Sequence, residues 1–243
     1  MTRKELEAKM LKNEPVEIFP LECMWNNQTQ TMKIVGEDWE GKMSIKEIDI
    51  NPKHIMILFM EPFKAMVLCK DQEGRYIFSH KMYSMLCKKR LEIGKIYDAE
   101  ITSVCDWGVF CNVEDANVLV HVKEISGCRF FELKRAFKVG DKFPVKILAK
   151  EENEYGLHVT ASRKQAGSDV DYKCGDIVSV IVASKLPVGC AVFCEVTPSV
   201  NGIVNVSEKQ LKQLNEGDKI PVVVRSRTEK GYKFSGMYTA IKK

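Results

Sequence analysis

The sequence lacks the common signatures of an enzyme or a metal protein. It has no C-x-x-C pair, no H-E-x-x-H motif and no phosphate-binding glycine loop, and its four histidines fall in separate segments. These absences argue against a zinc finger, a thioredoxin-like site, a metalloprotease and a P-loop NTPase. We therefore expect a non-enzymatic protein with no catalytic residue, no cofactor, no metal site and no small-molecule substrate.

Long apolar runs are absent as well. No stretch approaches the roughly 18 consecutive apolar residues that a membrane-spanning helix needs. The first residues, Met1 to Glu7, are charged and carry no apolar segment of a signal peptide. The nine cysteines, an odd number, are then best explained as small core residues in a reducing compartment. The sequence predicts a cytoplasmic protein without a membrane partner.

The chain also has only a small excess of positive over negative charge. The chain of 243 residues has 37 Lys+Arg against 33 Asp+Glu, a net charge of +4. Spread over the chain, this excess is too small for binding to nucleic acid or membrane by charge alone. The hydrophobic fraction of 45% is enough for folded cores, so wholesale disorder is not expected.

Three segments of the same pattern repeat along the chain. Each has an apolar strand, a charged turn and a second strand that closes on serine, at Ser79, Ser162 and Ser235, which are 83 and 73 residues apart. A repeat of this size indicates three copies of one small fold. The expected domains are an N-terminal helix at 1–13 and three copies at 14–87, 91–165 and 171–241.

Within the second copy, apolar residues alternate with a period of two. In segment 108–113, Val109, Cys111 and Val113 share one face, while Phe110 and Asn112 share the other, as in a half-buried strand. A short helix is expected at 130–137, after the third strand. Five strands around such a helix are the plan of a small Greek-key barrel of the OB type. The predicted fold is therefore all-β, with three tandem five-stranded OB-type barrels and short helices. The strands of the second copy are expected at about 98–105, 108–113, 118–123, 142–149 and 157–161.

The N-terminal residues follow a different pattern. Thr2 and Glu5 have the spacing of a capping box, and apolar Leu6 and Met10 follow. This predicts a short helix that packs on the first copy, with a partner-binding helix as the alternative.

The second copy also carries a specific series of motifs. In order they are Asp106-Trp107-Gly108-Val109-Phe110, Leu119-Val120-His121, Val139-Gly140-Asp141 and Ser162-Arg163-Lys164. This series resembles the S1 domain family, the RNA-binding repeat of bacterial ribosomal protein S1 and of polynucleotide phosphorylase. The resemblance covers about residues 91–164 and is degenerate in the flanking copies. It implies an OB barrel that binds single-stranded RNA in a bacterial or phage-like protein.

The resemblance also implies a binding site on the second and third strands of the copy. There, two aromatic side chains stack on bases and a histidine contacts the RNA; Trp107, Phe110 and His121 match them. Phe110 is indicated independently, because an exposed aromatic on a half-buried strand has no core role. Gly108 permits a bulge or sharp turn that brings Trp107 to the same face. Further candidates, drawn from the family pattern and from the flanking copies, are Arg163, Lys164, Glu151, Arg75, Phe193, Asn205 and Lys233.

The flanking copies have lost most of this site. Copy one carries Gln30, Lys33 and Ser44 at the three positions, and copy three carries Cys190, Phe193 and Asn205. Copy three adds basic residues around its last hairpin, which form either a phosphate site or a solvated charged hairpin; they are Arg225, Arg227, Lys230 and Lys233.

Two functions remain open on the sequence. The first is sequence-tolerant binding of single-stranded RNA in translation or RNA metabolism, with the ribosome or another RNA-processing protein as a further partner. The alternative is a protein-interaction module that docks on a ribosome, RNA polymerase or nuclease, because two of the three copies lack the stacking pair.

Overall fold

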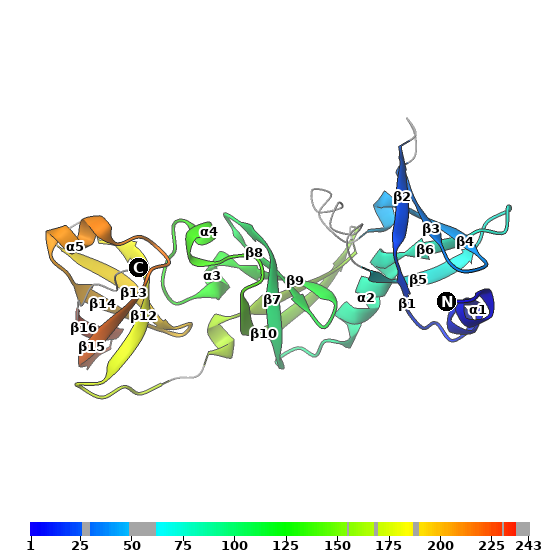
Figure 1. The fold of residues 1–243 in the computed structure, drawn as a ribbon. Coiled ribbons are helices and arrows are strands. Elements are labelled where there is room, and N and C mark those ends of the chain that lie inside the picture. Colours follow the sequence, from blue (N-terminus) through cyan, green and yellow to red (C-terminus); the bar gives the residue numbers. More distant parts are fainter. Residues whose placement is uncertain are drawn as a thin grey trace. The chain divides into compact units, whose positions relative to one another are not determined.

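The computed structural model is built mostly of β-strands. It describes residues 1–25, 30–48, 62–154, 156–167, 170–186, 190–229 and 231–236. The strands form three sheets in chain order (Figure 1), which confirms the expected all-β fold of tandem OB-type units. The chain divides into two compact units, Met1–Arg90 and Leu91–Lys243, and the second unit holds two closed barrels. The four domain boundaries remain predictions, and residues 237–241 of the last one lie outside the described residues.

The first unit contains a sheet with the strand order β1-β5-β6-β4-β3-β2. The first strand of the OB plan is divided at Phe19, so that β1 pairs with β5 while β2 pairs with β3. This division gives six strands where the sequence predicted five. The elements are β1 (Val16–Ile18), β2 (Pro20–Trp25), β3 (Gln30–Val35), β4 (Glu40–Ser44), the 3₁₀ helix η1 (Ile45–Glu47), β5 (Phe63–Lys70) and β6 (Tyr76–Ser79).

Two helices belong to this unit. The expected N-terminal helix is α1 (Arg3–Leu11), capped by the reciprocal bonds of Thr2 and Glu5, and its Leu6 is fully buried in the core of the sheet. Helix α2 (His80–Arg90) was not predicted; its buried Tyr83 and Cys87, four residues apart, line the face that packs on β5. The basic residues at its end lie in the last helical turn, where cations interact favourably with the helix dipole.

The second unit contains the two closed barrels, with strand orders β10-β11-β9-β8-β7 and β12-β13-β14-β16-β15. The strand predictions for copy two hold within a few residues, except that 122 and 123 belong to a helix. The second barrel has β7 (Ile96–Cys105), β8 (Gly108–Val113), β9 (Ala116–His121), α3 (Val122–Ile125), α4 (Leu133–Ala136), β10 (Lys142–Asn153), β11 (Gly156–Ser162) and the 3₁₀ helix η3 (Lys164–Ala166). The third has β12 (Ile177–Lys185), β13 (Ala191–Thr197), β14 (Val200–Asn205), α5 (Glu208–Gln213), β15 (Lys219–Thr228) and β16 (Gly231–Gly236).

The cysteines of the barrel interiors behave as core residues. Cys111 and Cys194 occupy equivalent strand positions, both are fully buried, and burial raises the pKa of each thiol to about 12. The described cysteines are free thiols, and the part of the chain that the structure describes holds no cluster of metal-ligating side chains. Among the described residues, no helix has the length and apolar character to cross a membrane.

One equivalent core position holds a glycine in the first and third copies and a valine in the second. In the third barrel Gly202 faces Tyr232 across the strands, and an added Cβ would lie 2.1 Å from the ring of Phe234. Copy one repeats this arrangement with Gly41, Tyr76 and Phe78. By the strand register, copy two has Val118 in place of the glycine, and Val159 and Ala161 take the positions of Tyr232 and Phe234. A small residue therefore accompanies the large aromatics, and a larger one accompanies small partners, as close packing requires.

We expect Gly202→Val to lower the free energy of unfolding of the second unit by about 2 kcal/mol or more, because it overfills this core. Adding Phe234→Ala recreates the pair found in copy two. The double variant should be less destabilised than the sum of the two single variants, measured by urea unfolding. Strict additivity would contradict this account of the packing.

A buried ion pair joins the two barrels of the second unit. Arg163, after β11, donates from both terminal nitrogens to Glu195 on β13, at 2.9 and 2.7 Å. Its guanidinium also donates to the carbonyl of Ile125 and lies over the rings of Phe137 and Phe143. The Glu195 side chain is only 2% exposed. The pair is therefore shielded from solvent and fixes the third barrel against the second.

Glu195→Ala should destabilise the second unit by about 3–5 kcal/mol, because it leaves the Arg163 charge buried and unpaired. The matched control is Glu100→Ala, which removes the exposed partner of Lys142 and should cost no more than about 1 kcal/mol. Urea unfolding of the full chain measures both. Equal losses of stability in the two variants would show that the buried pair does not stabilise the contact between the barrels.

Candidate nucleic-acid interface

Trp107 lies in a tight turn rather than on a strand. The turn Asp106–Trp107 joins β7 to β8, and the Trp107 carbonyl accepts a hydrogen bond from the Val122 amide at 2.9 Å. Gly108 follows where the backbones come close, since an added Cβ would lie 2.5 Å from the carbonyl oxygen of Val120. The turn presents the indole ring outward, with the side chain 48% exposed. The expected sharp turn at Gly108 is thus present.

Phe110 projects from the outer face of β8. Its neighbours Val109 and Cys111 are fully buried in the barrel, whereas Phe110 is half-buried. Its ring centroid lies 5.4 Å from that of Trp107, with the rings nearly perpendicular at 88°. The two aromatic side chains thus form an edge-to-face pair with apolar surface open to solvent.

His121 lies on β9, the strand next to β8. It is the last residue of β9 and pairs with Gly108 of β8. Its Nδ1 accepts a hydrogen bond from the Lys123 amide at 3.3 Å and so caps α3. This bond orients the imidazole and leaves Nε2 as the ring atom for a ligand.

Two further residues of this face were not singled out by the sequence analysis. Leu119 on β9 pairs with Phe110 on one side and with Thr160 of β11 on the other, and all three are half-buried. This row continues the aromatic surface across three strands. The register of β9 against β8 is the signal that identifies Leu119, because it places that residue directly opposite the predicted Phe110.

The third barrel has an equivalent row with different side chains. Phe193 pairs with Ile203, which pairs with Lys233, and Asn205 takes the place of His121. Lys233 and Asn205 are exposed, and Phe193 is half-buried. In the basic hairpin, Arg225 donates to Ser235 at 2.6 Å and Arg227 to Asp171 at 2.6 Å; the predicted Lys230 lies outside the described residues.

The first unit carries lysines where the second barrel carries the apolar row. Lys33 on β3 pairs with Lys42 on β4, and Ser44 pairs with Thr31 at the position of His121. Lys42 Nζ lies 2.7 Å from Asp71, which holds the pKa of that carboxyl well below its usual range. The candidate Arg75 bonds Asp71 at 3.0 Å and Glu73 at 2.7 Å.

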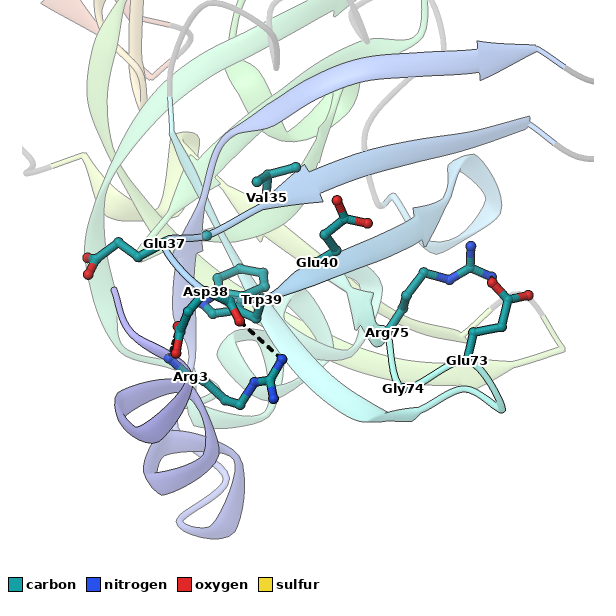
Figure 2. A pocket seen from close by; sticks show the side chains of 10 residues that line it. Arg3, Val35, Glu37, Asp38, Trp39, Glu40, Glu73, Gly74 and Arg75 are labelled. Atoms are coloured by element: carbon teal, nitrogen blue, oxygen red, sulfur yellow. Dashed lines mark hydrogen bonds and ion pairs between the residues drawn. The ribbon is translucent and has the colours of Figure 1, made fainter.

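Beside these charges lies a shallow pocket of about 400 Å³ (Figure 2). Arg3 and Arg75 contribute its positive charges, and Arg3 bonds the backbone carbonyl of Asp38 at 3.1 Å. Four carboxylates line the same pocket, so its net charge disfavours a phosphate. They belong to Glu37, Asp38, Glu40 and Glu73.

The remaining candidates lie at the ends of β10 and β11. Glu151 is exposed and pairs with His158 across the last hairpin, and Lys164 is exposed in η3. The structure gives Arg163 a different role, because both terminal nitrogens of its guanidinium bond Glu195. We therefore do not retain Arg163 as an RNA contact. The sequence could not reveal this, since its partner lies 32 residues away in another barrel.

The family comparison identifies the second barrel. Residues 90–162 match the model of the S1 RNA-binding domain. The second barrel is an S1 domain. Its Trp107, Phe110 and His121 come from the β7–β8 turn, β8 and β9 of that domain. The resemblance stated from the sequence is therefore confirmed for this copy.

Curated relatives extend the likeness beyond the S1 domain. The chain is 29% identical over 160 residues to a small ribosomal subunit protein bS1 homolog of Bacillus cereus, matching 60% of this chain and 41% of that protein. It is 30% identical over 253 residues to a 4-hydroxy-3-methylbut-2-enyl diphosphate reductase of Clostridium acetobutylicum, matching 89% of this chain and 38% of that protein. The chain thus spans about two fifths of the length of either relative.

A solved structure aligns with nearly the whole chain at low similarity. It is the crystal structure of a multidomain protein with nucleic acid binding domains from Streptococcus pneumoniae. The alignment covers 95% of this chain and 75% of that chain, with 13% sequence identity and a TM-score of 0.35. The fold of this chain is therefore assigned from its strand order and from the family match.

Arg75→Ala should leave the Kd for single-stranded RNA unchanged, because two carboxylates already neutralise this guanidinium. Lys233→Ala is the comparison variant, since it removes an exposed cation from the third barrel's row. If Lys233 meets a phosphate, its removal should weaken binding and reduce the salt slope by about 0.7. Fluorescence anisotropy at several salt concentrations measures both. A clear loss of affinity for Arg75→Ala would contradict the expectation.

Proposed function

We propose that the S1 domain of this protein binds single-stranded RNA without strong sequence preference. The observation that carries the proposal is the edge-to-face pair of the exposed Trp107 and the half-buried Phe110, whose ring centroids lie 5.4 Å apart at the barrel surface. Stacking on such rings contributes about 1–3 kcal/mol per base and tolerates every base, because each base has a π-face. In this proposal His121 and Leu119 extend the surface beside the rings.

Charge supports stacking as the main source of affinity. The S1 segment 91–166 contains 11 basic and 12 acidic residues, so the domain offers little general attraction for phosphates. Lys164 and Lys233 are exposed cations for isolated phosphate contacts, while Glu151 and Asn205 offer polar contacts at the margins of the two faces. A modest dependence of affinity on salt follows, and copies acting in series would strengthen binding.

We place this activity in translation or RNA metabolism, with the ribosome as a further partner and a cytoplasmic location. The similarity to the bS1 homolog supports this context. We propose a non-enzymatic role. The reductase name belongs to a protein of which this chain matches 38%, so it supplies no activity for this chain.

A second function, protein docking, is favoured for the first unit. Its row of Lys33 and Lys42 replaces the apolar row of the S1 domain, and its pocket carries four carboxylates against two arginines. These features suit a partner protein of mixed charge better than a strand of RNA. A pull-down with the full chain tests this role. It would be supported by a partner protein that stays bound after ribonuclease treatment and that contacts residues 1–90.

The decisive test of RNA binding is the double substitution Trp107→Ala with Phe110→Ala. We expect the Kd for oligouridylate to rise at least about 30-fold, because two stacking rings of about 1 kcal/mol or more each are lost. Both rings reach the barrel surface, so the fold should persist, which circular dichroism checks.

The matched control is Ile93→Ala. Its side chain is 62% exposed and precedes β7, at the end of that strand away from Trp107. This substitution should leave the affinity unchanged. Unchanged affinity in the double variant would refute the assigned site.

A further inference from the structure

Another exposed aromatic ring lies outside the face described above. Phe131 lies between α3 and α4 and is 65% exposed, more than Trp107. The guanidinium of Arg129 lies over its ring, 5.0 Å from the centroid. Within the described residues Arg129 forms no ion pair. A ring with such an arginine beside it combines a stacking surface with a positive charge, the two features that bind a nucleotide.

The backbone at this ring is held by the third barrel. Glu216, in the loop before β15, accepts hydrogen bonds from the amides of Phe131 and Glu132 at 3.1 and 2.7 Å. Gly127, earlier in the same segment, donates to the carbonyl of Pro198 at 2.8 Å. These bonds order the segment before any ligand arrives, which lowers the entropic cost of binding.

An ion pair links the segment that follows Phe131 to the turn that carries Trp107. Lys134 in α4, three residues after Phe131, forms an ion pair with Asp106 at 3.6 Å. Asp106 directly precedes Trp107 in the β7–β8 turn, and α4 packs on β7. One strand of RNA that leaves the Trp107 face toward α4 would therefore reach the Phe131 segment next.

We propose that Phe131 and Arg129 form a second stacking site for the single-stranded RNA that binds at Trp107 and Phe110. This inference rests on the proposed function of the S1 domain. In it the ring of Phe131 stacks on a base beyond the first site, and Arg129 contacts the base or an adjoining phosphate. The third barrel contributes indirectly, because Glu216 positions the segment.

The test uses oligouridylates of two lengths, about 4 and about 12 nucleotides, within the range that OB folds cover. With the full chain, Phe131→Ala should weaken binding of the longer oligomer at least about fivefold and leave the shorter one unchanged. Arg129→Ala should have the same pattern with a smaller effect, and Phe131→Tyr should retain the affinity. Val139→Ala, at a residue that is 66% exposed, is the matched control and should change neither Kd.

Measuring the Trp107→Ala, Phe110→Ala double variant in parallel separates the two proposals. That variant should bind both oligomers more weakly. If it does so while Phe131→Ala changes neither, the second site is refuted and the S1 face stands. If Phe131→Ala weakens both lengths equally, the ring belongs to the first site and the proposal of a second one is overturned. If no variant changes either Kd, the proposed RNA-binding function fails together with this inference.

Discussion

The pairing of β8 with β9 fixes which side chains of the second barrel meet solvent. Because side chains alternate along a strand, a shift of one residue would turn Phe110 inward and expose Cys111. The observed register buries Val109, Cys111 and Val113 completely, and places Leu119 opposite Phe110 on the outer face. The face proposed to bind RNA is thus a consequence of filling the barrel core. The same register brings Gly108 beside His121, and the close backbone approach at Gly108 leads directly into the turn that presents Trp107.

The three copies keep this register while changing what it displays. The central row is Lys33 and Lys42 in the first, Phe110 and Leu119 in the second, and Phe193 and Ile203 in the third. Two residues beyond Phe193, the third copy has Glu195, which receives Arg163 of the second barrel. Part of the outer face of β13 therefore serves to fix the barrels together. The proposed difference in function among the copies rests on their outward residues, since the inward ones are constrained by packing.

Much of the architecture was predictable because it depends on local patterns. Alternation in 108–113 predicted the strand and its outward-facing Phe110, and the spacing of Thr2 and Glu5 predicted the capped helix α1. Helix α2 was missed because its end, Lys88 to Arg90, is a run of basic residues that resembles a linker. The burial of Arg163 and the importance of Leu119 were missed for another reason: each depends on a partner that only the tertiary fold supplies. Long-range pairing of this kind leaves no periodic signal in a single sequence.

The most direct test of the central claim is an NMR titration that follows the indole N–H signals of the full chain with oligouridylate. Trp107→Phe assigns the signal of Trp107. Trp39 provides an internal control, since it is 6% exposed and its indole nitrogen donates to the Met1 carbonyl at 2.9 Å. If the S1 face stacks on RNA, the Trp107 signal should shift with added oligomer while the Trp39 signal remains in place. A saturating titration in which Trp107 does not shift would contradict the account.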